Sequence, residues 1–376
     1  MKKVLALLLV LVMALTFVAC DGNKDTEPTD APSGGTDYSD VKVGVVHIGD
    51  PADGSGYSFA HDQGIVAMQK NLGLKDDQIV RQLNIADNDK AATKTAIEDC
   101  IAKGCTIIFT TSYGYMDTTE ELAKEYPDVI FSHGTGYKSN DKNFNNYFGR
   151  IYQARYLAGI AAGLKSVSGK IGYVAAYGTE LAETCSGINA FALGVQSVNP
   201  DAKVYVKTLN SWFDPANETA FAEALIEMGC DVIAQHCDTA NPQKAAESKG
   251  VFGCGYNSDM TAEAPKAHLT APIWNWGVYY TKAAQAVMEG TWDAANYFGG
   301  MDDGLVDISP LSENCAEGTE EAIEAAKAKI KDGTFKVFEG ELFDNKGNQV
   351  CAAGEVISDA DITGAMNWYY RNVVAE

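Results

Sequence analysis

The stretch that decides the fold is Val41-Lys42-Val43-Gly44-Val45-Val46-His47-Ile48, together with the segment that follows it. Its branched apolar residues predict a buried strand, and a helical pattern then extends from about residue 58 to residue 72. A strand, a loop and a helix in this order form the first half of a βαβ unit. The loop between them therefore lies at the carboxyl end of a strand.

The same alternation of strands and helices continues along the chain and then starts a second time. Strands are expected at residues 78–85, 105–111, 128–133 and 146–151, and again at 170–175, 203–209, 232–236 and 251–255. Helices are expected at residues 90–103, 116–125, 152–165, 186–198, 215–228 and 242–249. Strands that alternate with helices of this length predict parallel sheets with helices on both faces. The sequence therefore predicts two doubly wound α/β lobes.

A third section follows, with a different order of elements. A hairpin is expected around Asn345-Lys346-Gly347, because Asn and Gly favour tight turns. Extended segments are expected at residues 269–273 and 297–308, and helices at residues 277–289, 317–331 and 359–371.

Length, composition and charge limit the possible functions. The chain has 376 residues, which is enough for two domains at roughly 100–200 residues each. Hydrophobic residues make up 46% and charged residues 21%, a balance typical of a soluble protein with a core. The formal net charge of -22 repels nucleic-acid phosphates and anionic lipid headgroups, so nucleic-acid binding is excluded.

The first twenty residues have the pattern of an export signal. Met1-Lys2-Lys3 precedes an apolar run that is short of the ~20 residues a membrane-spanning helix needs. Phe17-Val18-Ala19-Cys20 resembles a bacterial lipobox, in which the cysteine is lipidated and becomes the mature N-terminus. We therefore expect a signal peptide at residues 1–19, and a lipid anchor on Cys20 with a flexible linker at residues 20–40. The mature protein would be tethered to the cell membrane on its extracytoplasmic side.

The remaining cysteines leave two readings open. Their even number in an exported protein permits disulfides. Several lie in apolar or helix-end contexts, where Cys serves as a small buried hydrophobe, so we favour mostly free thiols. The disulfide state stays open for Cys100, Cys105, Cys185, Cys230, Cys237, Cys254, Cys315 and Cys351.

Patterns of catalytic and metal-binding residues are weak in this sequence. The histidines show no HExxH spacing, no G-x-S-x-G motif occurs, and no Cys/His cluster has zinc spacing. His236 and Cys237 are adjacent in a predicted strand, so their side chains point to opposite faces and do not form a catalytic pair. We expect no catalytic residues, no metal and no cofactor.

The loops at the carboxyl ends of the strands are rich in aromatic and polar residues. Ligands of doubly wound folds bind at those ends. The first loop lacks the G-x-G-x-x-G spacing and a Lys, which argues against nucleotide binding. It presents Tyr57 either as a flat surface for stacking or as packing at the start of a helix, and both readings remain open. Aromatic faces bind planar rings, while Asp and Asn supply directional hydrogen bonds.

Several blocks, in one order along the chain, carry a resemblance to a known family. They are Gly56-Tyr57-Ser58-Phe59-Ala60-His61-Asp62-Gln63-Gly64, Tyr147-Phe148-Gly149-Arg150, Gly187-Ile188-Asn189-Ala190-Phe191, Asp231-Val232-Ile233-Ala234-Gln235-His236 and Trp274-Asn275-Trp276-Gly277. With them the chain resembles, from about Val41 to Asp307, the basic membrane protein family of bacterial solute-binding lipoproteins, which includes the PnrA-like nucleoside receptors.

The resemblance implies a periplasmic-binding-protein type 1 fold. Two doubly wound parallel-sheet lobes, joined by three crossovers, would close on a ligand and deliver it to an ABC importer. The first lobe would comprise residues 41–149 plus about 272–300, and the second residues 150–270 plus about 305–376.

The resemblance also implies where the ligand binds. The base-holding aromatic and Asn of nucleoside-binding members fall on Tyr57 and Ser58 here. The second stacking aromatic falls on Gly187 and is absent, so Trp212 or Tyr177 would replace it.

The family's ribose contacts are also missing from this sequence. Its ribose-contacting Lys falls near Trp274-Asn275, where there is no Lys, and its acid falls on Asn257. A free purine base or a related planar heterocycle is therefore the better ligand.

The sequence thus predicts a lipid-anchored binding protein of an ABC importer for a purine base or nucleoside. It would act as a monomer, with the importer's permease subunits as partners. The candidate ligand-binding residues are Tyr57, Ser58, Ser112, Tyr113, Tyr177, Asn189, Trp212, Asp238, Trp274 and Asn275.

Two alternatives remain open. One is a secreted nucleoside-processing enzyme, for which Asp50, Asp53 and Asp62 are the nearest candidates to activate water. The other is a sugar or peptide receptor on the same fold.

Overall fold

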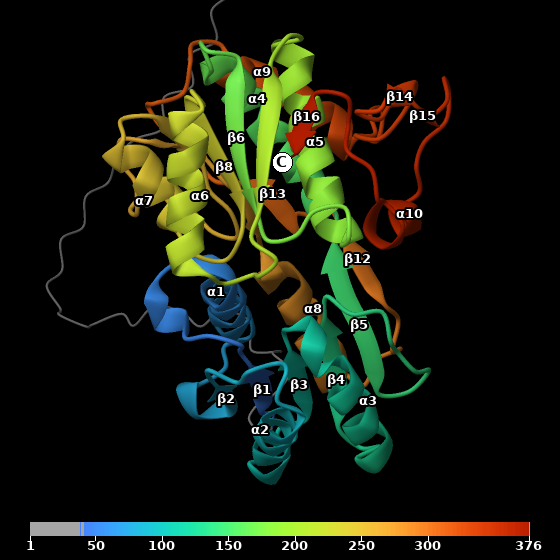
Figure 1. The fold of residues 1–376 in the computed structure, drawn as a ribbon. Helices are drawn as coiled ribbons and strands as arrows, with labels where there is room; N and C mark the ends of the chain where they lie inside the picture. The colour runs from blue at the N-terminus through green and yellow to red at the C-terminus, as the bar shows by residue number, and fades with distance from the viewer. Residues whose placement is uncertain (1–37, 39–40, 376) are drawn as a thin grey trace, which may run out of the picture. The chain divides into compact units, whose positions relative to one another are not determined.

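Two six-stranded sheets organise the protein, each at the centre of one α/β lobe (Figure 1). The computed structural model describes Tyr38 and residues 41–375. The expected signal peptide and nearly all of the expected linker therefore lie outside the described residues.

The first sheet has the strand order β12-β5-β4-β3-β1-β2, and each neighbouring pair is parallel. Its strands are β1 (Val43–Val46), β2 (Ile79–Gln82), β3 (Ile107–Thr110), β4 (Ile130–Gly134), β5 (Phe144–Gly149) and β12 (Tyr297–Gly299). The helices of this lobe are α1 (Gly56–Leu72), α2 (Lys90–Ala102), α3 (Met116–Glu125) and α8 (Trp276–Met288), with short 3-10 turns η1 (Pro51–Asp53), η2 (Asp76–Gln78) and η3 (Tyr113–Tyr115).

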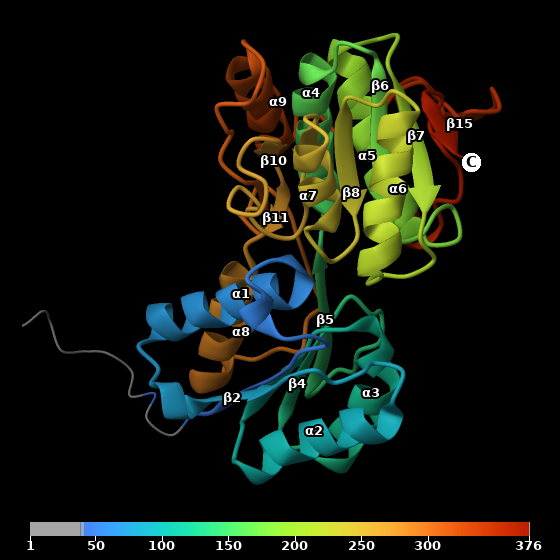
Figure 2. The ribbon, with the colours of Figure 1, turned by 60° about the vertical axis from the view of Figure 1, so that its left-hand side comes forward.

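Alternate residues of the first sheet face two different cores, as the two-residue period of a strand requires. Val45 and Phe109 belong to the core that includes α1 and α8. Their neighbours Val46 and Ile108 belong to the core beneath α2 and α3. Figure 2 shows the two helix pairs on opposite sides of the sheet.

The second sheet has the strand order β10-β9-β8-β6-β7-β16 and is also parallel throughout. Its strands are β6 (Lys170–Ala175), β7 (Lys203–Thr208), β8 (Val232–His236), β9 (Phe252–Cys254), β10 (His268–Thr270) and β16 (Val373–Ala375). Its helices are α4 (Ile151–Lys165), α5 (Ala182–Val198), α6 (Pro215–Glu227) and α7 (Asn241–Ser248). Tyr173 packs on Phe191 of α5, whereas the next residue, Val174, lies in the core with Leu225 of α6.

The chain passes between the lobes three times: after β5, after β10, and after β12. At the last two crossings β11 (Pro272–Trp274) pairs with β13 (Val306–Ile308) in an antiparallel ribbon. The predicted fold class, two doubly wound lobes of the periplasmic-binding-protein type 1 fold, is confirmed.

The C-terminal section contains α9 (Thr319–Lys331), β14 (Leu342–Phe343), β15 (Gln349–Cys351) and α10 (Asp359–Gly364). The predicted hairpin is present as the pair β14–β15. The predicted helix over residues 359–371 is wrong in its second half, because α10 ends at Gly364. The chain then continues to β16, which pairs with β7 at the edge of the second sheet.

Candidate functional site

The carboxyl ends of the strands in both lobes meet around the start of α1. Gly56, the first residue of α1, has a φ of 84°. A Cβ built on it would lie 2.1 Å from the backbone oxygen of Asp238, which follows β8 in the second lobe. Only glycine therefore fits both the backbone conformation and the contact between the lobes. Figures 1 and 2 both show α1 on the side of the first lobe that faces the second.

Tyr57, the residue after Gly56, lies at one end of a row of aromatic rings. Its ring packs edge-on against His61, with centroids 4.4 Å apart, and its hydroxyl donates to the backbone oxygen of Thr111. The His61 ring stacks on Trp276 at 4.6 Å, and Trp276 stacks on Trp274 at 4.4 Å. Burial raises the pKa of the Tyr57 hydroxyl well above its usual value, and nearby tyrosine and carboxyl groups raise it further. Tyr57 is therefore a neutral, rigidly held ring.

Three other predicted residues of the first lobe lie in the loops beside Tyr57. The buried Ser58 hydroxyl accepts a hydrogen bond from the Gly49 amide at 2.9 Å, which ties the first loop together. The Ser112 hydroxyl donates to Asp87 at 2.7 Å. Tyr113 opens η3 with 54% of its surface exposed, so its ring is accessible.

In the second lobe, the predicted residues Tyr177, Trp212 and Asp238 lie together. The rings of Tyr177 and Trp212 meet edge to face at 5.5 Å. The Asp238 amide donates to the backbone oxygen of Trp212 at 2.9 Å, which holds the loops after β7 and β8 side by side. The Trp212 ring lies 5.7 Å from that of His236.

Near these loops lies a group of charged and polar side chains from two helices, one strand and two loops, which we call the polar cluster. Arg155 comes from α4, Glu183 from the first turn of α5, His236 from the end of β8, Asp238 from the loop after β8, and Asn257 from the loop after β9.

Two pairs within the polar cluster are in contact, and Arg155 packs on a neighbouring ring. His236 Nε2 lies 3.8 Å from Glu183 Oε1, and Asn257 Nδ2 donates to Asp238 Oδ1 at 3.2 Å. The Arg155 guanidinium lies 3.9 Å from the centroid of the Tyr256 ring, the distance of a cation–π contact.

Burial sets the charge state of the polar cluster. It raises the pKa of Asp238 to about 8, although the hydrogen bond from Asn257 opposes the shift. It raises the pKa of Glu183 to about 7, against the attraction of Arg155. Burial and the charge of Arg155 both lower the pKa of His236 well below its usual value, so this imidazole is neutral. Asp238 and Glu183 also raise the pKa of Tyr57, and the backbone oxygen of Asp238 closely approaches Gly56, the residue before Tyr57.

Three predicted residues have other surroundings. Trp274 is buried, and its indole nitrogen donates to Tyr256 at 3.4 Å. Asn275 is exposed and donates to the backbone oxygen of Gly304 at 3.0 Å. Asn189 is fully buried, where it donates to the Trp368 oxygen at 2.7 Å and accepts from the Tyr370 amide at 2.8 Å. The structure therefore brings Asn189 to the C-terminal segment and not to the polar cluster.

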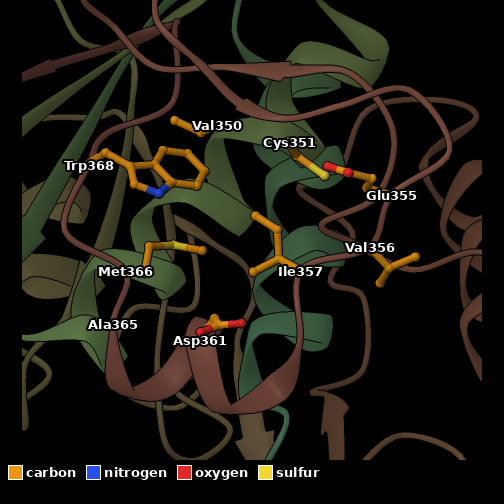
Figure 3. A pocket seen from close by; sticks show the side chains of 9 residues that line it. All are labelled: Val350, Cys351, Glu355, Val356, Ile357, Asp361, Ala365, Met366 and Trp368. Atoms are coloured by element: carbon orange, nitrogen blue, oxygen red, sulfur yellow. The ribbon is translucent and has the colours of Figure 1, made fainter.

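A separate cavity lies in this C-terminal section (Figure 3). Its volume is about 510 Å³, and none of its lining residues is a predicted site residue. They are Val350, Cys351, Glu355, Val356, Ile357, Asp361, Ala365, Met366 and Trp368.

Sequence reasoning missed Arg155, which lies on a helix, and also Glu183, which falls in the predicted loop after residues 170–175 but lies in the first turn of α5. A signal for Arg155 exists: it is the one charged residue in the buried part of α4, from Ile151 to Gly163, whose other residues are apolar or uncharged. Glu183 has no comparable signal in the sequence.

Two of the three carboxylates considered for hydrolysis have structural partners. Asp50 accepts from the Ala52 amide at 2.9 Å as the cap of η1. Asp62 pairs with Arg81 at 2.7 Å and lies 3.5 Å from His47. Within residues 38 and 41–375, no group of three or more His, Cys, Asp or Glu is arranged to hold a metal.

Two further properties concern the described residues as a whole. All eight of their cysteines are free thiols in this structure. In the same part of the chain, no helix combines the length and the apolar character that crossing a bilayer requires.

Comparison with known proteins identifies the family. Residues 41–338 match the family described as ABC transporter substrate-binding protein PnrA-like. The chain belongs to this family. Members of this PnrA-like family are solute-binding proteins of ABC transporters, which act outside the cytoplasm, bind a small molecule and work with permease subunits. The family therefore points away from an enzyme. The resemblance to this family, which the sequence blocks predict, is confirmed.

Two curated relatives cover most of this PnrA-like chain. A purine-binding protein of Brucella abortus (strain 2308) is 39% identical over 333 residues, which is 89% of this chain and 93% of the relative. A putative ABC transporter glucose-binding protein of Haloferax volcanii is 35% identical over 327 residues, covering 86% of this chain and 81% of the relative.

Solved structures agree on the fold. A solute-binding protein of an ABC transporter system from Aeropyrum pernix K1 has a TM-score of 0.66 at 18% identity, covering 79% of this chain and 92% of its own. A transcriptional activator of the comK gene from Bacillus halodurans has a TM-score of 0.68 at 20% identity, covering 78% and 99%. At these identities the likeness concerns the fold alone.

Proposed function

We propose that this protein binds a purine base or nucleoside between its two lobes by aromatic stacking and delivers it to an ABC importer. One observation carries the proposal. Tyr57 in the first lobe directly follows Gly56, which closely approaches the backbone oxygen of Asp238 in the second lobe, and the charges of Asp238 and Glu183 raise the pKa of the Tyr57 hydroxyl. A flat aromatic face beside hydrogen-bonding groups suits a heterocyclic base, because stacking contributes ~1–3 kcal/mol per base.

The Brucella relative supports the purine as ligand. It is named a purine-binding protein, and at 39% identity it aligns with 89% of this chain. A purine needs both an aromatic platform and groups that donate to and accept from its edge. Tyr57 and Asp238 offer these two properties from opposite lobes.

Each of the other aromatic residues has a proposed role. Trp212 stacks on the second face of the base, and Tyr177 supports Trp212 through their edge-to-face contact at 5.5 Å. Trp274 supports the row of rings behind Tyr57, and the exposed Tyr113 covers the rim of the site. The polar residues Ser58, Ser112 and Asn275 hold the loops that carry these rings.

Delivery follows from closure of the lobes. A ligand that contacts both lobes favours the closed state by its differential affinity for that state. A few kcal/mol of such difference is enough to change the dominant state. The permease subunits would recognise the closed monomer.

We also propose that Cys20 carries a lipid and that residues 21–40 form a tether. The support is the sequence alone: an apolar run after a basic start, a small residue before the cysteine, and a polar segment after it. In this arrangement the binding protein stays at the membrane surface near its importer.

A sugar is the second candidate ligand. The Haloferax relative, at 35% identity over 86% of this chain, is named a putative glucose-binding protein. Sugars also lie against aromatic rings and bond to carboxylates, so Tyr57 and Asp238 are compatible with a hexose.

Calorimetry with purified protein separates the candidates. Adenine, hypoxanthine, guanosine, ribose and glucose are titrated under one set of conditions. Saturable binding of a purine base or nucleoside, with no comparable response to ribose or glucose, is the expected result. Tight sugar binding without purine binding overturns the purine proposal, and turnover of guanosine to base and ribose would make the protein an enzyme instead.

A further inference from the structure

The polar cluster holds unsatisfied hydrogen-bonding atoms deep inside the protein. His236 is fully buried, and neither of its ring nitrogens has a hydrogen-bond partner within the described residues. The same holds for Nε and Nη2 of Arg155, which is 1% exposed, and for Oδ1 of Asn257, which is also 1% exposed. Buried polar groups are normally paired, so a group of unpaired ones marks a place where a bound molecule supplies the partners.

The two acids of the polar cluster are half-buried and have few donors around them. Among the described residues, the Glu183 carboxyl lies 3.8 Å from Nε2 of the neutral His236, which is longer than a hydrogen bond. Asp238 receives one bond, from Asn257 Nδ2, on Oδ1. A carboxylate has about four acceptor sites, and burying it without donors is costly. Their ligand should therefore bring N–H or O–H groups to these oxygens.

We infer that Asp238 and Glu183 accept the ring N–H of a free purine base, so that the site selects bases over nucleosides and nucleotides. This inference rests on the proposed function. A free base has one N–H in its five-membered ring. A nucleoside carries its sugar on that nitrogen and has lost the donor, which leaves a buried acceptor unpaired.

The charge of the polar cluster also favours a free base over a nucleotide. The cluster holds two carboxyl groups and one guanidinium, of which Arg155 acts on Glu183, and Glu218 adds a third acid that raises the pKa of Asp238. A phosphorylated purine would bring negative charge to this group and be repelled. A neutral base brings no negative charge and can donate hydrogen bonds to the carboxyl groups of the polar cluster.

The test uses adenine and 9-methyladenine, because the methyl group removes the only ring N–H and leaves the stacking face intact. Affinities are measured by calorimetry for the wild type, for D238N and for the control D128N. Asp128 is an exposed acid before β4 in the first lobe, so D128N makes the same charge change far from the strand ends.

Two results are expected. The wild type and D128N bind adenine about ten-fold or more tighter than 9-methyladenine, the scale of one lost hydrogen bond to a charged group. In D238N this preference collapses. Because Asn257 Nδ2 already holds one oxygen of Asp238 at 3.2 Å, the new amide turns its NH₂ group toward the ligand and replaces an acceptor with a donor.

The outcomes separate the inference from the proposed function. Equal binding of adenine, 9-methyladenine and adenosine overturns the inference but leaves purine binding in place. A preference for adenine that persists unchanged in D238N indicates steric exclusion of the methyl group and also overturns it. Absence of any purine binding overturns the proposed function itself. Glu183→Gln, measured in parallel, tests whether Glu183 also accepts a hydrogen bond from the ring N–H of the base.

Discussion

Gly187 of α5 faces His236 so closely that a Cβ at position 187 would lie 2.8 Å from His236 Nδ1. The same Cβ would lie 3.1 Å from Nε of Arg155. Gly187 is also the position on which the second stacking aromatic of nucleoside-binding members falls. In this protein the space beside Gly187 contains an imidazole and a guanidinium instead of an aromatic side chain.

Gly187→Ala should therefore disturb the polar cluster. We expect it to lower the free energy of unfolding by about 1–3 kcal/mol, the usual cost of overpacking a filled core. It should also weaken purine binding, because His236 and Arg155 must move. Urea unfolding and calorimetry measure the two effects. Gly364→Ala is the matched control, since a Cβ there meets nothing within 4 Å. Equal behaviour of the two variants would show that the polar cluster tolerates a side chain at position 187.

Tyr57→Ala should weaken binding of the preferred purine by ~1–3 kcal/mol, because the base loses its stacking platform. Tyr57→Phe should lose much less, since the ring face remains and only the bond of the hydroxyl to the Thr111 oxygen is lost. Calorimetry of both variants measures the loss. If Tyr57 only packs the start of α1, the alanine variant will show a lower melting temperature without ligand. Its affinity for the purine will then fall only as far as this loss of stability accounts for.

Asn189→Ala should destabilise the protein without changing its ligand preference. The substitution leaves the Tyr370 amide and the Trp368 oxygen without the partner that each now has. Unpaired buried backbone groups cost about 1–3 kcal/mol, which urea unfolding detects. Asn71→Ala is the control: this exposed side chain donates to Thr281 at 3.1 Å, and its loss should stay within about 0.5 kcal/mol. A selective loss of purine affinity in Asn189→Ala, with normal stability, would show that Asn189 takes part in ligand binding.

The fold was predictable from the sequence where local pattern decides structure. Residues 170–175 and 232–236 were predicted as strands with the bounds that β6 and β8 have, because buried parallel strands are continuous apolar runs. The C-terminal helix was overextended for the opposite reason. Residues 365–375 are held by Asn189 and by pairing of β16 with β7, contacts that span more than a hundred and fifty residues of sequence.

The candidate site was predictable only in its loops. Tyr57 and Asp238 follow strands, so the rule for strand ends finds them. Arg155 and Glu183 depend on how α4 packs on α5. A Cβ on Gly159 would lie 2.1 Å from the Phe191 oxygen, so the two helices approach closely at this point. Local sequence patterns do not predict which residues of two helices meet in such a tertiary contact.

Cys20→Ser should release the protein from the membrane fraction and leave its ligand affinity unchanged. The reason is that Cys20, the proposed lipidation site, is separated from Val43, the first residue of β1, by a polar segment. Fractionation of cells followed by calorimetry on the released protein measures both properties. A variant that remains fully in the membrane fraction contradicts the anchor.

The affinity for adenine should rise with pH between about 6 and 8. Burial raises the pKa of Asp238 to about 8 and that of Glu183 to about 7, so both carboxyl groups are largely protonated in the free protein at the acidic end of this range.

A ligand N–H bonds best to the ionised form, so binding must displace a proton at low pH and need not do so above the free-protein pKa. Each acid that loses its proton on binding can contribute up to about ten-fold in affinity per pH unit below its pKa. Of the other groups near Asp238, Glu218 and Glu183 oppose its ionisation, and burial keeps the Tyr57 hydroxyl protonated.

Calorimetry at several pH values, in buffers of different ionisation enthalpy, measures both the affinity and the protons released on binding. The D238N variant should show a shallower rise, because the acid with the highest pKa is gone. The response of 9-methyladenine should be shallower as well, because it has no ring N–H to offer to the ionised carboxylate. An affinity for adenine that stays constant or falls from pH 6 to pH 8 would mean that the ligand meets these carboxyl groups in their protonated form, with its acceptors turned toward them.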